Sequence, residues 1–329
     1  MEKVNEGDMT RGTGAIPDAP DNRDYQYSTI ATSFPPFDWS LGYDIEEKIG
    51  KKLTVKDQDG SGSCGGQAFG YYGMAIDPDN EEKSAKFIYS QVFVPPAGSA
   101  GRDLATLVCN KGMADENLCV SYDGGFPPSE AFMERKSDIT KEAFADALID
   151  TALSYANVQI NIDDIAQALR NNGGLVIGIT GKNNGTWTSK FPLPPVKVDS
   201  TCWNHWIYCG KAKIINGKKY IGFLNSWGTS VGEKGWQWIT EDYIKYPFVW
   251  SAWTLVYNFP KPINTYIFTT TMKIGSKGDE VKELQKRVNA NPDGIFGPKT
   301  KLLVKAWQLK HGLVPDGIVG PKTREVLNK

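Results

Sequence analysis

The chain has 329 residues, with 37 Lys and Arg against 38 Asp and Glu, and 40% of its residues are hydrophobic. A chain of this length can bury a full core and has room for about two domains. No apolar run reaches the roughly 18 residues that a membrane-spanning helix needs, and residues 1–20 contain no apolar core of a secretory signal peptide. We therefore expect no membrane span, and synthesis in the cytoplasm without an evident signal peptide.

Residues 57–76, DQDGSGSCGGQAFGYYGMAI, predict a reactive cysteine at the start of a helix. Cys64 follows a glycine-rich loop, and the unpaired N–H groups at a helix N-terminus favour the thiolate form. Gln58 precedes it by six residues, so the Gln58 amide and the Cys64 backbone N–H can both donate to a developing oxyanion. Since a lone cysteine in a soluble protein is more often a buried structural residue, the assignment depends on residues downstream.

In the next part of the chain, predicted helices come mostly early and predicted strands late. Apolar residues recur at helical spacing in 81–94 and in 141–155. Residues 162–174 combine an acidic first turn with a glycine stop, as a helix does. The run LVIGIT at 175–180 follows as a short buried strand. The pattern predicts a mixed α+β domain.

The chain has two histidines, and His205 lies in an apolar, aromatic run that predicts a strand. The next predicted strand ends in Asn225-Ser226-Trp227-Gly228. An Asn beside a His can accept the proton of one ring nitrogen and direct the other nitrogen toward a thiol, while Trp227 shields that hydrogen bond from water. Taken singly, His205 reads as a core histidine and Asn225 as a turn residue. Together with the upstream cysteine and glutamine, they indicate a nucleophile with its base.

Gln, Cys, His and Asn in this order resemble the catalytic set of the papain-like cysteine peptidases, in their bacterial and phage style. The resemblance covers about 14–258: PPFDWS at 35–40 resembles the start of the mature domain, and 14–28 resembles the short extension before it. It implies a two-lobed α+β domain with the site between the lobes. It also implies a role for each matching residue: Cys64 as nucleophile, His205 as base, Asn225 as its orienting partner and Gln58 as oxyanion donor. We place Trp206 and Trp227 at the substrate-binding surface, since Trp206 stands where the pocket for the second substrate residue begins.

Three features depart from the family pattern, and one of them is Trp206, which follows the histidine where a small residue is common. The family usually has an aromatic residue right after the nucleophile, whereas here Gly65, Gly66 and Gln67 come before Ala68-Phe69. An alignment on Ala-Phe alone would put Gly66 at the nucleophile position, so we keep the register set by the six-residue gap before Cys64. Val231 stands where the family often has a second tryptophan, which leaves the substrate preference open.

The five cysteines are an odd number, so at least one thiol is free if the others pair. Cys109 and Cys119 are able to bridge. Cys202 and Cys209 lie an odd number of residues apart on a predicted strand, so they point to opposite faces and should not pair with each other. No CxxC pair or Cys/His cluster indicates a structural zinc, and we expect no metal and no cofactor.

The composition changes after residue 257. Two prolines and a threonine cluster predict a linker over 259–271. Beyond it, DGIFGPKT at 293–300 is repeated as DGIVGPKT at 316–323, each a tight turn followed by a helix start. Apolar residues at helical spacing predict helices within 278–289 and 300–312. This unit resembles the bacterial peptidoglycan-binding domain, a small three-helix domain, and we expect its repeated turns to be structural.

The charge divides along the same line. Residues 272–329 contain 12 Lys and Arg against 6 Asp and Glu, a net of +6, which leaves 25 against 32, a net of −7, for residues 1–271. A basic module suits an anionic polymer such as a bacterial cell wall. It has no aromatic stacking platform and no nucleic-acid motif, so we expect peptidoglycan and not nucleic acid as its partner.

The sequence thus predicts four parts: an N-terminal extension (1–34), a peptidase domain (35–258), a linker (259–271) and a peptidoglycan-binding domain (272–329). The expected function is that of a cysteine endopeptidase acting at the bacterial cell wall. It would be a phage-type endolysin or a virion-associated lysin that cuts wall peptides or wall-embedded proteins. The alternative is a wall-binding structural or virion component whose peptidase fold is inactive; the intact catalytic set favours the enzyme.

Overall fold

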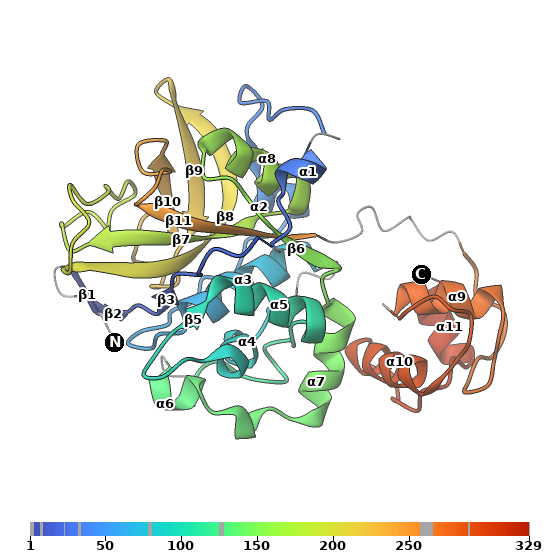
Figure 1. The fold of residues 1–329 in the computed structure, drawn as a ribbon. Coiled ribbons are helices and arrows are strands. Elements are labelled where there is room, and N and C mark those ends of the chain that lie inside the picture. The colour runs from blue at the N-terminus through green and yellow to red at the C-terminus, as the bar shows by residue number, and fades with distance from the viewer. Residues whose placement is uncertain are drawn as a thin grey trace.

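The computed structural model describes residues 3–6, 9–22, 24–31, 34–77, 81–124, 128–256, 266–288 and 290–328. In this part of the chain, a sheet lobe packs against a helical lobe, and a group of three helices follows them (Figure 1). No described helix combines the length and apolar character that crossing a membrane requires.

An antiparallel sheet forms the first lobe. Its strands are β4 (Tyr43–Asp44), β6 (Ser154–Asn157), β7 (Leu175–Lys182), β8 (Cys202–Ile215), β9 (Lys218–Leu224), β10 (Trp236–Thr240) and β11 (Val249–Val256). Their order is β10–β9–β8–β7–β11–β6, with β4 paired to β8. The helix α8 (Ile162–Asn172) packs its apolar face on this sheet, with α1 (Ser28–Ala31) beside it (Figure 1). As the sequence predicts, α8 has an acidic first turn and ends at Gly173, which adopts the left-handed conformation.

The helical lobe is built around α3 (Cys64–Ile76), which is buried along nearly its whole length. Around it lie α2 (Ile45–Ile49), α4 (Ala85–Val92), α5 (Gly101–Lys111), α6 (Glu130–Met133), η1 (Lys136–Asp138), α7 (Lys141–Ala147) and η2 (Leu148–Asp150). Four glycines in α3 let neighbouring elements approach closely: a Cβ at Gly66 would lie 2.5 Å from the carbonyl oxygen of Ala85 at the start of α4. The predicted helix within 81–94 is α4, and the Ser84 hydroxyl caps it by accepting from the N–H of Phe87.

The segment 141–155, predicted to be one helix, divides into three elements. Only α7 is α-helical; η2 follows, and residues from Ser154 onward form β6. β6 pairs with β11 at the edge of the sheet, where Tyr155 lies opposite Leu255. The prediction was wrong for the last residues because strand pairing with a distant segment overrides local helical spacing.

The N-terminal residues run along the boundary between the lobes. A hairpin of β1 (Lys3–Glu6) and β2 (Met9–Gly12) leads into β3 (Ala15–Ile16), which pairs in parallel with β5 (Ser99–Ala100) (Figure 1). We call residues 11–16 the strap. The strap lies against residues 60–62, which directly precede α3.

The C-terminal unit consists of α9 (Asp279–Arg287), α10 (Pro298–Lys310) and α11 (Pro321–Leu327). Each repeated turn is held by a buried glutamine of the preceding helix. Gln285 donates to the Asp293 carboxylate at 2.8 Å, and Gln308 donates to the Asp316 carboxylate at 2.9 Å. Both glutamines also bond the threonine that closes the motif, at 3.1 Å. The repeat therefore encodes one structural device used twice.

The predicted linker lies outside the described residues as far as residue 265. Of its remaining part, Phe268 is buried in the core of the three C-terminal helices, and its N–H donates to the Asn328 side chain at 2.8 Å. Tyr266 packs against the same core. Residues 266–271 thus belong to the packed C-terminal unit in the structure.

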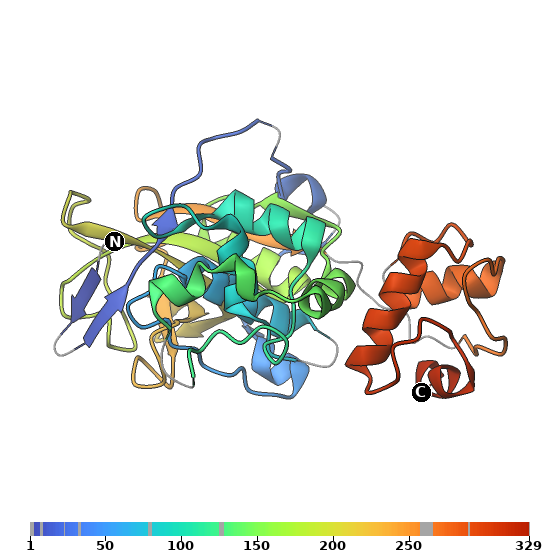
Figure 2. The same ribbon diagram turned by 90° about the horizontal axis from the view of Figure 1, so that it is seen from below.

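The C-terminal unit contacts the helical lobe through α10, which packs against α7 and η2 (Figures 1 and 2). The Lys310 ammonium, 7% exposed, lies 2.9 Å from the Asp77 carboxylate and 3.4 Å from that of Asp150. Lys83 lies 2.5 Å from Asp77 and 2.6 Å from Asp150 in the same cluster. Asp115 completes a carboxylate triad whose spacing could suit a cation, but the Lys83 ammonium already lies among these carboxylates. The cluster is an ion-pair network that joins the two units.

Candidate active site

Cys64 is the first residue of α3, the helix of the helical lobe that contacts β8 of the sheet lobe. The two glycines after it are required by packing. A Cβ at Gly65 would lie 2.5 Å from Leu104 and 3.2 Å from Trp206, and Gly66 abuts α4. There is no room for the aromatic residue that the resemblance leads one to expect directly after the nucleophile. This explains the departure while keeping Cys64 at the helix start.

The Cys64 thiol is fully buried, and burial raises its pKa to about 12. Backbone hydrogen bonds from Trp206, Gly14 and Gly65 lower the pKa but do not offset the burial. The expected effect of the helix N-terminus is thus outweighed in this state of the protein, and the sulfur is a neutral thiol at neutral pH. Because Trp206 follows His205 in the sequence, its hydrogen bond to the sulfur also connects Cys64 to the strand that carries the histidine.

His205 and Asn225 come from neighbouring strands and meet in the core. His205 lies on β8, Asn225 directly follows β9, and the His205 Nε2 is 3.0 Å from the Asn225 Oδ1. Trp227 is fully buried over the imidazole, with ring centroids 4.8 Å apart and planes tilted by 33°. Burial lowers the pKa of His205 to about 4, and the hydrogen bond to Asn225 opposes this shift. The buried His205 Nδ1 has no hydrogen-bond partner within the described residues.

Gln58 lies in the loop that precedes α3. Its Nε2 donates to the carbonyl oxygens of Gly12, at 3.1 Å, and Ser61, at 2.8 Å. Its Oε1 accepts from the Ser226 hydroxyl at 2.5 Å, so the glutamine is tied to the Asn-Ser-Trp-Gly segment. The side chain is fully buried. Both hydrogens of the Gln58 amide are thus used in this structure, one toward the strap residue Gly12 and one toward the loop before α3.

The strap covers this group of residues. Its Gly12 carbonyl takes the Gln58 amide, its Gly14 N–H lowers the pKa of the Cys64 thiol, and its Gly14 carbonyl accepts from the N–H of Ser99 at 2.9 Å. A Cβ at Gly12 would lie 2.2 Å from the Ser61 carbonyl oxygen, and one at Gly14 would lie 2.0 Å from that of Gly62. Only glycine fits at either position. The strap therefore excludes water, and any substrate, from the thiol.

The two tryptophans predicted to bind substrate are both fully buried. Trp206 donates from Nε1 to the Ser99 carbonyl at 2.9 Å, and its ring packs edge-on to that of Trp250, with centroids 4.8 Å apart. Trp227 packs on His205, as described above. In this structure Trp206 borders β5 and the strap, and Trp227 shields the His–Asn hydrogen bond.

Sequence reasoning missed Gln237, a fully buried glutamine of β10 that accepts from the Asn225 Nδ2 at 2.8 Å. The signal was present as a polar residue between aromatic and apolar ones in Trp236-Gln237-Trp238-Ile239. Sequence reasoning also missed the strap, whose signal is the alternation of glycine with small residues in RGTGA. Neither signal says which distant segment is contacted.

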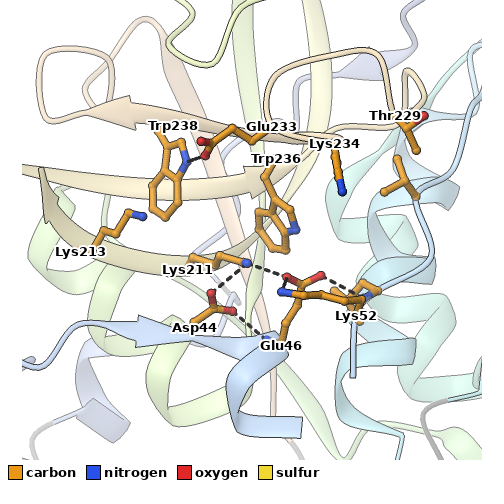
Figure 3. A pocket seen from close by; sticks show the side chains of 12 residues that line it. Asp44, Glu46, Lys52, Lys211, Lys213, Thr229, Glu233, Lys234, Trp236 and Trp238 are labelled. Carbon is orange, nitrogen blue, oxygen red and sulfur yellow. Dashed lines mark hydrogen bonds and ion pairs between the residues drawn. The ribbon is translucent and has the colours of Figure 1, made fainter. Parts of the chain in front are cut away.

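A hollow of about 420 Å³ lies beside β10 (Figure 3). Trp236 and Trp238 line it, with the Lys211 and Lys213 ammonium groups 4.2 and 4.1 Å from their ring centroids. These tryptophans point away from the face of β10 that carries Gln237, since successive side chains of a strand alternate. Its described lining contains neither cysteine nor histidine. This hollow is therefore separate from the Cys64 site.

All five cysteines are free thiols. Cys109 and Cys119, for which a bridge was considered, do not pair. Cys202 and Cys209 do not pair either, as predicted from their positions on one strand; Cys209 is fully buried and Cys202 is partly exposed.

Comparison with solved structures identifies the fold of the two lobes. The chain superposes on xylellain, a cysteine protease from Xylella fastidiosa, with a TM-score of 0.62 and 21% identity, covering 78% of this chain and 98% of that one. For proCathepsin B S9 from Trypanosoma congolense the TM-score is 0.58 at 14% identity, with 74% and 85% covered. For the digestive procathepsin L 3 of Tenebrio molitor larval midgut it is 0.53 at 16% identity, with 75% and 76% covered.

The C-terminal unit is identified independently. Residues 277–327 match the family model of the putative peptidoglycan binding domain. No curated protein matches the sequence. The chain thus joins the two-lobed fold of the papain-like cysteine proteases to a small helical domain of the peptidoglycan-binding family.

Proposed function

We propose that the protein is a cysteine endopeptidase targeted to the bacterial cell wall, of the phage-lysin type, cutting wall peptides or wall-embedded proteins. The observation that supports it most is the His205–Asn225 hydrogen bond, which Trp227 shields. The residue after His205 is Trp206, whose backbone N–H donates to the Cys64 sulfur. A buried histidine whose second nitrogen is left without a partner is suited to take a thiol proton.

In the proposed mechanism, the Nδ1 of His205 takes the proton of the Cys64 thiol, and the sulfur attacks the carbonyl carbon of the scissile peptide bond. The Gln58 amide and the Cys64 backbone N–H stabilise the oxyanion. The imidazolium of His205 then protonates the leaving amine, leaving a thioester on Cys64. Water, deprotonated by His205, hydrolyses the thioester and restores the free thiol.

We further propose the division of labour predicted from the sequence: residues 35–258 for cleavage, 272–329 for wall binding, with 1–34 as an extension and 259–271 as a connection. The family match at 277–327 and the net charge of +6 over 272–329 support the second role. Because Phe268 is buried among the C-terminal helices, a fragment used to measure wall binding should begin at residue 266.

Digestion assays test the proposed activity. Purified peptidoglycan and casein are each incubated with the protein, and mass spectrometry identifies the released fragments. Fragments with new amino termini from either material are expected, and their sequences tell wall peptides from protein substrates. The Cys64→Ala protein is the control and should release none. If neither the wild-type protein nor Gly14→Ala, in which the strap is displaced, releases fragments from either material while both still bind wall, the inactive wall-binding alternative is favoured.

Wall binding is expected to reside in the C-terminal unit. Residues 266–329, expressed alone, should sediment with insoluble wall, and residues 1–256 should remain in the supernatant. Binding should weaken as salt rises, because exposed charges more than about 8–10 Å apart are screened near physiological ionic strength. Sedimentation over a salt series measures both effects. Pelleting of 1–256 in place of 266–329 would contradict the assignment.

A further inference from the structure

Gln237 is a buried polar side chain in an aromatic strand, and every part of its amide is used. Its Nε2 donates to the carbonyl oxygens of Trp187, at 2.8 Å, and Ser189, at 2.6 Å. Its Oε1 accepts from the Asn225 Nδ2 at 2.8 Å. A buried amide is costly unless it is hydrogen-bonded in this way. The three bonds connect the 187–189 segment to the site residue Asn225.

These contacts determine which group donates in each hydrogen bond between Gln237 and His205. Backbone carbonyls only accept, so the NH₂ end of Gln237 must face Trp187 and Ser189. Its oxygen then faces Asn225, which must present its own NH₂ end. The Asn225 Oδ1 is therefore turned to His205, 3.0 Å from Nε2. Because Oδ1 also only accepts, Nε2 must carry the proton of the neutral imidazole, and Nδ1 keeps its lone pair.

We propose that Gln237 is the positioning residue that places the proton of His205 on Nε2 and so leaves Nδ1 as the base toward Cys64. The inference rests on the proposed function for its catalytic meaning, but the proton position is a property of the folded protein. Without Gln237, the Asn225 amide is free to turn over. It would then present NH₂ to Nε2, and the imidazole proton would move to Nδ1, which could no longer accept the thiol proton.

Histidine NMR tests the proton position directly in the full-length protein, because the chain contains only His205 and His311. The His311 Nδ1 lies 2.7 Å from the Trp307 carbonyl oxygen, so its proton is on Nδ1 and it serves as an internal reference of opposite tautomer. In ¹⁵N-histidine spectra recorded above pH 7, wild-type His205 should show the Nε2–H form. In Gln237→Met, which keeps the length of the side chain without its amide, the Nε2–H form should be largely lost while His311 stays unchanged.

Kinetics with a small soluble peptide test the consequence. Gln237→Met should lower kcat about 10–100-fold, the loss commonly caused by removing the hydrogen-bond partner that orients a metal-ligating histidine, with KM unchanged. In an Asn225→Ala background the same substitution should cost nothing further, because Gln237 acts only through Asn225. Gln308→Met, which removes an equally buried and hydrogen-bonded glutamine from the C-terminal unit, is the matched control and should leave peptide hydrolysis unaltered.

The pH dependence of kcat/KM tells a loss of histidine positioning in Gln237→Met from a general loosening of the fold. Burial and the Asn225 bond are the causes that shift the pKa of His205, and no charged group of the described residues adds to them. An acceptor at Nε2 stabilises the imidazolium, so its loss should lower the pKa of His205 further and move the acid limb of kcat/KM to lower pH. The alkaline limb should not move, because it is set by the Cys64 thiol, and neither Asn225 nor Gln237 is among the causes that shift the pKa of that thiol. A loosened fold would lower the rate at every pH without moving either limb.

The outcomes are distinguishable from those of the proposed function. A protein that cleaves no peptide, either as wild type or with the strap displaced by Gly14→Ala, refutes the proposed function but leaves the NMR result to decide the proton position. If folded Gln237→Met retains the Nε2–H form of His205, or loses activity equally in the Asn225→Ala background, Gln237 is not the positioning residue.

Discussion

Replacing Cys64 by alanine is expected to abolish peptide hydrolysis, and His205→Ala should do the same. The methyl group cannot form the thioester, and without the imidazole the thiol, whose pKa burial raises to about 12, stays protonated at neutral pH. Because the two groups act as one unit, the double variant should be hardly slower than either single one. Initial rates on a small soluble peptide measure this, with thermal unfolding recorded to show that the fold is kept.

Cys109→Ala provides the matched control, since it removes another free thiol, one that lies on α5 and is not among the proposed site residues. Its activity should equal that of the wild-type protein. An active Cys64→Ala protein would contradict the assignment of the nucleophile, and the other thiols would then have to be tested in turn.

Substituting the strap glycines is expected to activate the protein. In Gly14→Ala the new Cβ would lie 2.0 Å from the Gly62 carbonyl oxygen, and in Gly12→Ala it would lie 2.2 Å from that of Ser61. Both contacts are with backbone, so either the strap or the loop at 60–62 must shift, and we expect the strap to leave the site. Overpacking of this kind costs typically about 1–3 kcal/mol, and 1.4 kcal/mol is a tenfold change in an equilibrium constant. We therefore expect the initial rate on a small peptide to rise about tenfold or more.

The same substitutions should make Cys64 reactive. Burial is the largest cause of its raised pKa, and the Gly14 N–H is a smaller, opposing one. Displacing the strap admits water, so the pKa should fall and alkylation of Cys64 by iodoacetamide should begin at lower pH. Gly297→Ala is the control, since nothing lies within 4 Å of its added Cβ. If folded Gly14→Ala is no faster than the wild-type protein and its Cys64 stays unreactive, the strap does not close the site.

The sequence by itself determined the local elements. Residues 162–172 are flanked by their own cap and stop residues, Asn161 and Gly173, so α8 forms where it was predicted. The doubled DGI-GPKT motif identified a unit built from one turn used twice, because each turn is set by residues close along the chain. The order of Gln58, Cys64, His205 and Asn225 carried enough of the family pattern for the fold to be recognised.

Only the tertiary structure decided what lies against these residues. The strap reaches Cys64 from far along the chain, and no local signal in RGTGA specifies that contact. Gln237 reads as an isolated polar residue until β10 and β9 pair and bring it to Asn225. The physical reason is common to both. Capping and turn formation depend on neighbours within a few residues, whereas burial, hydrogen-bond direction and the pKa of Cys64 depend on segments that meet only when the whole core has formed.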